Sequence, residues 1–291
     1  MSNIITLKRR IASVKSTKQI TKAMELVSAS KMRRAQDYAL QSREYRDVAY
    51  SLLQRLGSIK EVDTHPLFQQ RTVKNRLYIV ITSNSGLAGA YNYNVMKLLS
   101  GSIAADKQAA VKSHVITIGK QAANFVRRLQ GVDLMAVYPA FNDHPEANDV
   151  RPILNTLVDQ YKNGHVDEVL LVYTMFKSNL VQQVQLLSLL PADTPGQPDR
   201  LDYKYKFTNF EPSVDVVIDN IATRLIEAQI WQSVLESLAS EHSMRMLAMK
   251  NATDNANDLI DNLTLVFNTA RQANITQELA EITGGAEALR D

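Results

Sequence analysis

The sequence predicts a mixed α+β or α/β fold: a long antiparallel coiled coil of the N- and C-terminal helices, plus a Rossmann-like α/β middle domain. One observation is where the helix breakers lie. All eight prolines and eight of the ten glycines fall between Gly57 and Pro212, so residues 1–56 and 213–283 contain neither. The other is that short apolar runs alternate with helix-like segments in the middle. We therefore divide the 291-residue chain into residues 1–59, 60–205 and 206–291.

The first 56 residues predict one helix, roughly 85 Å long at 1.5 Å per residue. Such a helix must cover its apolar side, and a second long helix is the simplest cover. A seam with 3-4-3 spacing is formed by Ile4, Leu7, Ile11 and Val14, and it then meets Lys18 and Thr21. A second stripe begins nearby with Ile20, Met24 and Val27 and ends at Lys31. We expect a pairing that holds over a few turns and drifts elsewhere.

The middle of the chain predicts a β-α-β-α-β-α-β order with a mostly parallel sheet. The expected strands are runs rich in Val, Ile, Leu and Tyr, at residues 77–82, 114–118, 132–137 and 168–176, with a further strand-like run at 179–190. Helix-like patterns separate the first four, at residues 94–108, 121–129 and 147–162.

Residues 213–283 predict the second long helix, roughly 105 Å if continuous. Its heptad seam, spaced 4-3-4-3, consists of Ala256, Ile260, Leu263, Phe267 and Ala270, before Asn274 and Gln277 interrupt it. Small residues are frequent in both helices, which favours a slim rod. The two helices are therefore expected to pair with each other.

No catalytic, cofactor or metal site is predicted. The absence of cysteine excludes disulfides, cysteine zinc sites and thiol catalysis. The loop at 83–90 contains Gly86 and Gly89 but neither the dinucleotide fingerprint nor the phosphate-loop motif, so a plain strand-to-helix turn is favoured over an anion site. The five histidines show no metal-ligand spacing. No apolar run is long enough to span a bilayer, and a soluble cytoplasmic protein is expected.

Basic residues gather at the N-terminus. Residues 1–36 contain nine Lys or Arg and one acid, Glu25, a net charge of +8 in a chain whose total is +3. Such a helix suits an acidic protein partner, nucleic acid or an acidic membrane surface. A basic coiled-coil nucleic-acid-binding protein is thus one alternative function, and a nucleotide-using enzyme built on the middle domain is another.

Both ends of the chain resemble a known family. Residues 7–36, LKRRIASVKSTKQITKAMELVSASKMRRAQ, resemble the N-terminal signature of the gamma subunit of the rotary F-type ATP synthase. Residues 236–289, ESLASEHSMRMLAMKNATDNANDLIDNLTLVFNTARQANITQELAEITGGAEAL, resemble its C-terminal signature. The middle domain is similar in layout.

The resemblance, which is to the bacterial type, implies a central-stalk rotor. Its coiled coil would turn inside a ring of three alpha and three beta subunits, and its middle domain would stand with the epsilon subunit on the c-subunit ring. Ion flow would drive the rotation, and catalysis would occur on the beta subunits, so the chain itself would be non-catalytic and without a cofactor. It would bind no nucleic acid and would lie at the cytoplasmic face of the plasma membrane as a peripheral protein, attached only through the complex.

The resemblance also implies nine partner-contact residues. Those in the C-terminal helix are Arg245, Arg271, Gln272, Thr276 and Glu278, which match contacts with beta. Those near an acidic loop of beta are Lys22, Met24, Lys31 and Arg33. An ordinary coiled-coil core position is the alternative for Met24, and a solvated helix face is the alternative for Arg271 and Gln272.

One loop departs from the family pattern. The family usually has an Asp-Arg-Gly-Leu-Cys-Gly-like loop after the first strand, whereas this chain has Asn84-Ser85-Gly86-Leu87-Ala88-Gly89. Both charges and the thiol are missing, so any partner contact made by that charged pair is not expected here.

Overall fold

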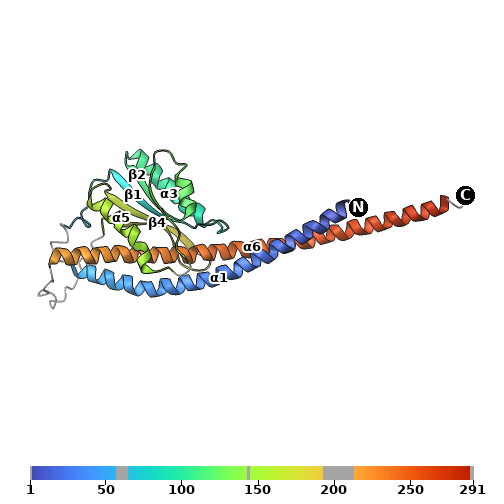
Figure 1. Cartoon of the computed structure of the whole chain (residues 1–291), viewed down its shortest axis with the longest axis horizontal. Coiled ribbons are helices and arrows are strands. Elements are labelled where there is room, and N and C mark those ends of the chain that lie inside the picture. The colour runs from blue at the N-terminus through green and yellow to red at the C-terminus, as the bar shows by residue number, and fades with distance from the viewer. Residues whose placement is uncertain (1, 57–64, 143–144, 193–212, 289–291) are drawn as a thin grey trace. The chain divides into compact units, whose positions relative to one another are not determined.

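The computed structural model describes residues 2–56, 65–142, 145–192 and 213–288. Contacts divide the chain into two compact units: the helical unit comprises Met1–Ser28 and Arg245–Asp291, and the sheet unit comprises Ala29–Met244. Two long helices, α1 (Ser2–Leu56) and α6 (Val214–Ala288), contribute to both (Figure 1). The domain boundaries expected from the sequence, at 59/60 and 205/206, lie outside the described residues.

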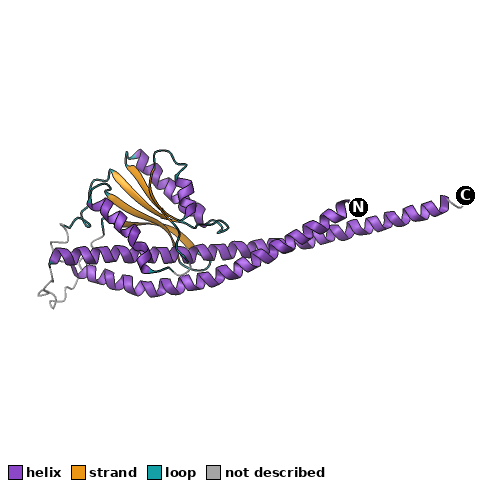
Figure 2. Cartoon of the chain, in the orientation of Figure 1, coloured by secondary structure: helices purple, strands orange, loops and turns teal. Residues whose placement is uncertain are grey.

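In the sheet unit, a five-stranded sheet is flanked by helices (Figure 2). The elements are β1 (Asn75–Ile81), α3 (Tyr91–Gln108), β2 (Lys112–Ile118), α4 (Lys120–Val126), β3 (Asp133–Tyr138), the 3₁₀ helix η1 (Ala147–Val150), α5 (Arg151–Lys162), β4 (Glu168–Phe176) and β5 (Gln182–Leu190). The strand order is β3-β2-β1-β4-β5, and only β5 runs antiparallel. The predicted fold class, two long helices with a Rossmann-like α/β domain, is confirmed.

The central strand β1 supplies both cores of the sheet unit. Its side chains alternate, so Leu77 and Ile79 face one layer and Tyr78 and Val80 face the other. The first layer holds α5 and the part of α6 between Ile218 and Val234, and the second holds α3 and α4. A parallel sheet covered on both faces is the usual result of such crossover connections. This packing fixes α6 to one face of the sheet.

A buried ionic cluster lies at the amino end of β1. Asp106 of α3 is 1% exposed and accepts hydrogen bonds from Arg76, from the Tyr78 hydroxyl (2.7 Å) and from the Ser113 hydroxyl (3.0 Å). Arg76 also contacts Glu168 of β4 at 2.6 Å. Burial, together with the hydrogen bond to Asp106, raises the pKa of Tyr78 well above its ordinary value. The cluster joins α3 to β1, β2 and β4.

Replacing Asp106 with Ala is expected to destabilise the sheet unit by about 3–5 kcal/mol, because buried Tyr78 and Ser113 lose their acceptor and half-buried Arg76 loses one of its two carboxylate partners. Trp231, the single tryptophan, packs against the sheet core, so its fluorescence during urea unfolding reports on this unit. The matched control is Asp133→Ala, whose carboxylate is 63% exposed beside His114 and is expected to cost under about 1 kcal/mol. Equal unfolding midpoints for the two variants would contradict the assignment.

In the helical unit, α1 and α6 lie side by side in opposite directions (Figure 1). The Thr21 and Thr253 hydroxyls are 2.8 Å apart. Fourteen residues further out along each helix, this register places Leu7 level with Phe267. The buried and half-buried positions continue with the same spacing on both helices: 4, 7, 11, 14, 18 and 21 on α1, and 270, 267, 263, 260, 256 and 253 on α6. The unit is a two-stranded antiparallel seam.

The sequence predicts that the seam stops where its residues become polar, but in the structure it continues through them. Lys18 is half-buried and Thr21 is buried, whereas Ile20 and Val27 of the expected second stripe are 60% and 53% exposed. The two threonine hydroxyls satisfy each other, and each also lies near a carbonyl oxygen of its own helix. Helix geometry therefore decides which positions are buried, and hydrogen bonding makes their polarity tolerable.

Candidate partner-contact surface

The residues predicted to contact partners fall into two groups, one in each unit. The helical unit holds seven, namely Lys22, Met24, Arg245, Arg271, Gln272, Thr276 and Glu278, and the sheet unit holds Lys31 and Arg33. Within the helical unit, Lys22 lies near the Thr21–Thr253 pair, and Arg271 lies near the level of the start of α1. About 28 Å of helix separates these two levels, at 1.5 Å per residue. Lys22 and Arg271, two of the predicted contact residues, therefore lie at separate levels of the helical unit.

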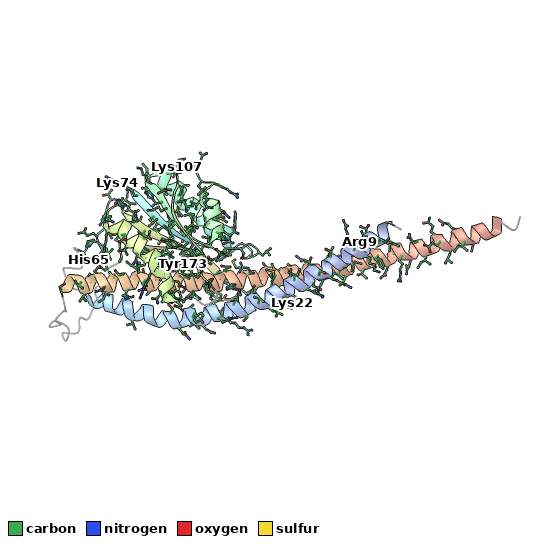
Figure 3. All side chains as sticks on the ribbon, viewed as in Figure 1. Arg9, Lys22, His65, Lys74, Lys107 and Tyr173 are labelled. Atoms are coloured by element: carbon green, nitrogen blue, oxygen red, sulfur yellow. The ribbon has the colours of Figure 1, made fainter. Side chains whose placement is uncertain are left out.

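The basic part of α1 faces outward because its cations lie between the seam positions. Lys8, Arg9, Arg10, Lys15 and Lys22 are exposed, and Figure 3 shows Arg9 and Lys22 on this helix. Lys22 donates hydrogen bonds to both carboxylate oxygens of Glu25, at 3.0 and 3.1 Å. Such an exposed pair contributes only tenths of a kcal/mol and competes weakly with a partner. Sequence reasoning missed this pair, although its i, i+3 spacing was visible.

Met24 and Arg245 are less open than the other residues of the helical unit. Met24 is half-buried beside the seam, which agrees with a position shared between the coiled-coil core and the surface. Arg245 is 8% exposed and is the only buried residue among the nine. A partner contact by Arg245 stays a prediction, and it would have to use the small part of the side chain that remains open.

The end of α6 combines polar contact candidates with an apolar stripe. Beyond Ala270, only Asn274 among the residues with described burial is not exposed. Ile275, Leu279 and Ile282 are 48%, 59% and 68% exposed and have a 4-3 spacing, so they share one side of the helix. This stripe was missed from the sequence, although the spacing that reveals it was present.

Helical spacing places polar residues on both sides of this stripe. Arg271 and Glu278 are one heptad apart and lie along one flank. Gln272 and Thr276 are one turn apart and lie along the other flank. All four are exposed. An apolar strip with a polar border is the usual composition of a protein-binding surface.

In the sheet unit, Lys31 and Arg33 differ in exposure. Arg33 is exposed, whereas Lys31 is half-buried and lines a shallow pocket. The other lining residues include Arg34 and Tyr38 of α1 and His242 of α6. Of the two predicted residues, Arg33 is thus the one open to a partner.

The carboxyl end of the sheet, where many α/β proteins bind nucleotides, is occupied by the chain's own contacts. The Asn84 side-chain oxygen accepts hydrogen bonds from the backbone N–H groups of Lys120 (3.3 Å) and Ala140 (3.2 Å). Gly119, with φ of +98°, packs so closely that a Cβ would lie 2.1 Å from the Thr82 carbonyl oxygen. The loop at 83–90 therefore acts as a strand-to-helix turn whose polar groups bind neighbouring loops.

In the part of the chain that the structure describes, no group of three or more His, Asp or Glu side chains is arranged to hold a metal ion. Within the same residues, no helix has the length and apolar character needed to cross a membrane.

Comparison with known proteins gives matches along the whole chain. A family model described as ATP synthase matches residues 3–289. The ATP synthase gamma chain of Pelotomaculum thermopropionicum is 40% identical over 99% of this chain and 100% of that protein. That of Herpetosiphon aurantiacus is 42% identical over 99% of each.

Solved structures share the fold at low sequence identity. The Euglena gracilis mitochondrial ATP synthase, solved as OSCP, F1 and c-ring in rotational state 3, contains a chain similar to this one with a TM-score of 0.69 and 18% identity. The match covers 99% of this chain and 95% of that one. The central stalk and c-ring structure of the Tetrahymena thermophila mitochondrial ATP synthase contains another, with a TM-score of 0.59 and 22% identity over 80% and 99% of the two chains.

Proposed function

Given that this chain belongs to the ATP synthase gamma chain family, we propose that it is the central-stalk rotor of such a synthase and couples transmembrane ion flow to ATP synthesis. The observation that carries this function is the helical unit. Its two segments come from opposite ends of the chain, pair along one seam, and continue into a stretch of α6 with exposed polar and apolar side chains. No comparison favours nucleic-acid binding.

The helical unit is the part that would turn within a ring of alpha and beta subunits. The exposed end of α6 supports this, because the stripe formed by Ile275, Leu279 and Ile282 would be covered by an apolar sleeve, and Arg271 and Gln272 on its two flanks would make polar contacts. The exposed cations of α1, together with Arg33, suit an acidic loop of beta.

The sheet unit would bind the epsilon subunit and the c-subunit ring, and the chain would lie at the cytoplasmic face of the plasma membrane only through the complex. Catalysis would belong to the beta subunits. A non-catalytic role is supported by the carboxyl end of the sheet, where Asn84 and Gly119 bring the chain's own loops together.

The energies of such a coupling fit a shaft with uneven sides. A ligand or partner changes an equilibrium only through contacts that differ between the two states. Changing one site from 1:99 to 99:1 requires about 5.5 kcal/mol of differential contact energy. Each elementary charge crossing 100 mV supplies about 2.3 kcal/mol. A few ions per step are therefore sufficient, and the contacts can be few and local.

Reconstitution tests the proposal. The purified chain alone is expected to hydrolyse no ATP, and when it is added to alpha, beta and epsilon subunits on membranes that contain the c-ring, it should restore ATP synthesis driven by an ion gradient. The same mixture without the chain is the control. ATP hydrolysis by the isolated chain, or no restoration by a folded chain, would contradict the rotor assignment.

A further inference from the structure

The end of strand β4 extends beyond its neighbour on one side. β1 pairs with β4 only as far as Val80 opposite Val172, whereas β5 pairs with β4 as far as Gln182 opposite Phe176. The backbone of Thr174 therefore has β5 on one side and no strand on the side where β1 has ended. Backbone N–H and C=O groups that are buried without a partner are costly, and Thr174 is only 2% exposed.

Two serines of α6 take the place of the missing strand. The Thr174 N–H donates to the Ser237 hydroxyl oxygen at 3.3 Å, and the Ser240 hydroxyl donates to the Thr174 carbonyl oxygen at 3.2 Å. Both serines are buried, with 1% and 0% exposed. Figure 3 labels Tyr173, the residue before Thr174, on the strand that meets α6 here.

A third serine, Ser243, lies three residues further along α6 and binds the turn between β4 and β5. The Ser243 hydroxyl donates to the Asn179 carbonyl oxygen at 2.8 Å and accepts a hydrogen bond from the Gln182 side chain at 3.2 Å. Gln36 of α1 donates to the Asn179 side chain at 3.0 Å, so both long helices hold this turn. The three serines are spaced by three residues and follow a ridge that runs obliquely across the helix.

We propose that Ser237, Ser240 and Ser243, here called the serine clamp, are the positioning residues through which rotational load passes between the sheet and α6. This inference rests on the proposed rotor function. The ion pairs Lys162–Asp219 and Arg151–Glu227 join the first part of α6 to α5 and not to a strand. The remaining contact of α6 with the sheet itself is mostly apolar and therefore non-directional. Hydrogen bonds are directional and resist displacement along the helix.

The position of the clamp suits this role. It occupies the last residues of α6 within the sheet unit, immediately before the helical unit begins at Arg245. α6 continues without a break from the clamp into the helical unit, so torque that enters α6 here can reach the end of that helix directly. Serine is short and lets the helix approach the strand closely, and a hydroxyl bound to backbone cannot be lost without leaving the partner unsatisfied.

The first test is structural and uses the full chain. Ser237→Ala removes the acceptor of the Thr174 N–H, so native-state hydrogen exchange at that amide should become about tenfold faster. Ser102→Ala is the matched control, because the Ser102 hydroxyl donates only to Leu98 of its own helix. Unchanged exchange at Thr174 would show that the hydrogen bond does not hold the strand end.

The second test measures load in the reconstituted complex. The triple variant Ser237→Ala, Ser240→Ala, Ser243→Ala should hydrolyse ATP and pump ions like the wild type when no ion gradient opposes pumping. Against a full gradient, its pumping should fall by about tenfold, because a weakened clamp yields under load. A role in stability alone would lower activity equally with and without the gradient.

Folding and ion pumping are both measured, so that the possible outcomes can be told apart. Trp231 fluorescence during urea unfolding shows whether the triple variant folds, and if it does not, the single variant Ser240→Ala replaces it. Loss of pumping that depends on the gradient supports the clamp. Equal pumping by variant and wild type against the full gradient overturns the clamp alone, whereas a wild-type chain that restores no coupling overturns the rotor assignment instead.

Discussion

Leu7→Asp is expected to open the helical unit and to reduce ATP synthesis to the background level. Leu7 is 8% exposed and lies in the seam level with Phe267. An unpaired carboxylate at this position would cost about 3–5 kcal/mol, and the apolar part of the seam has few other layers to offset it. Far-ultraviolet circular dichroism should show a loss of helix, while Trp231 fluorescence keeps its unfolding midpoint because Trp231 belongs to the sheet unit.

The matched control is Ile5→Asp, the same kind of change two residues away. Ile5 is 54% exposed, outside the seam, so its carboxylate stays in water and helix content should hardly change. If the two variants lose helix to the same extent, the seam at Leu7 does not hold α1 against α6. If Leu7→Asp keeps full ATP synthesis, the paired helices are not the shaft.

Arg271→Glu should lower ATP synthesis at least about 25-fold without changing stability. Arg271 is exposed near the end of α6, one heptad before Glu278 and beside the stripe that contains Ile275. Losing one partner of a charge pair buried in an interface costs about 2–5 kcal/mol, and each 1.4 kcal/mol corresponds to tenfold. Synthesis rates in membrane vesicles measure the effect, and urea unfolding verifies the fold.

Lys107→Glu is the control for this charge reversal. Lys107 is an exposed cation in the last turn of α3, far along the chain from the predicted contact residues, and Figure 3 shows it on that helix. Its reversal should leave synthesis near the wild-type rate. A wild-type rate for Arg271→Glu as well would show that Arg271 lies on a solvated helix face.

The fold followed from the sequence because its strongest signals were local. Glycine and proline marked the end of α1 and the start of α6, and alternating apolar runs marked the strands, although α6 continues through Gly284 and Gly285 to Ala288. The details that were missed depend on pairs of distant residues. The spacing predicts that the seam ends at Lys18 and Thr21, because both are polar, and the partner of Thr21, Thr253, cannot be identified from spacing.

The surroundings of the predicted contact residues could be foreseen from the sequence only in part. Family resemblance indicated Arg271 and Gln272, and the structure places both on an exposed helix end. The family resemblance could not indicate that Arg245 is buried or that Lys22 is paired with Glu25, because both facts depend on which side of a helix faces its neighbours. The serine clamp was also hidden, since it exists only where β1 ends before β4.

The pairing of Thr21 with Thr253 joins residues 232 positions apart, and this separation has a consequence for biosynthesis. At roughly 5–20 residues per second, the ribosome needs on the order of ten seconds or more to make the second threonine after the first. During that time the nascent N-terminal helix has no second helix to cover its apolar side. Every premature stop codon upstream of residue 253 releases a polypeptide that can never complete this joint, and such fragments are natural clients for chaperones and proteases.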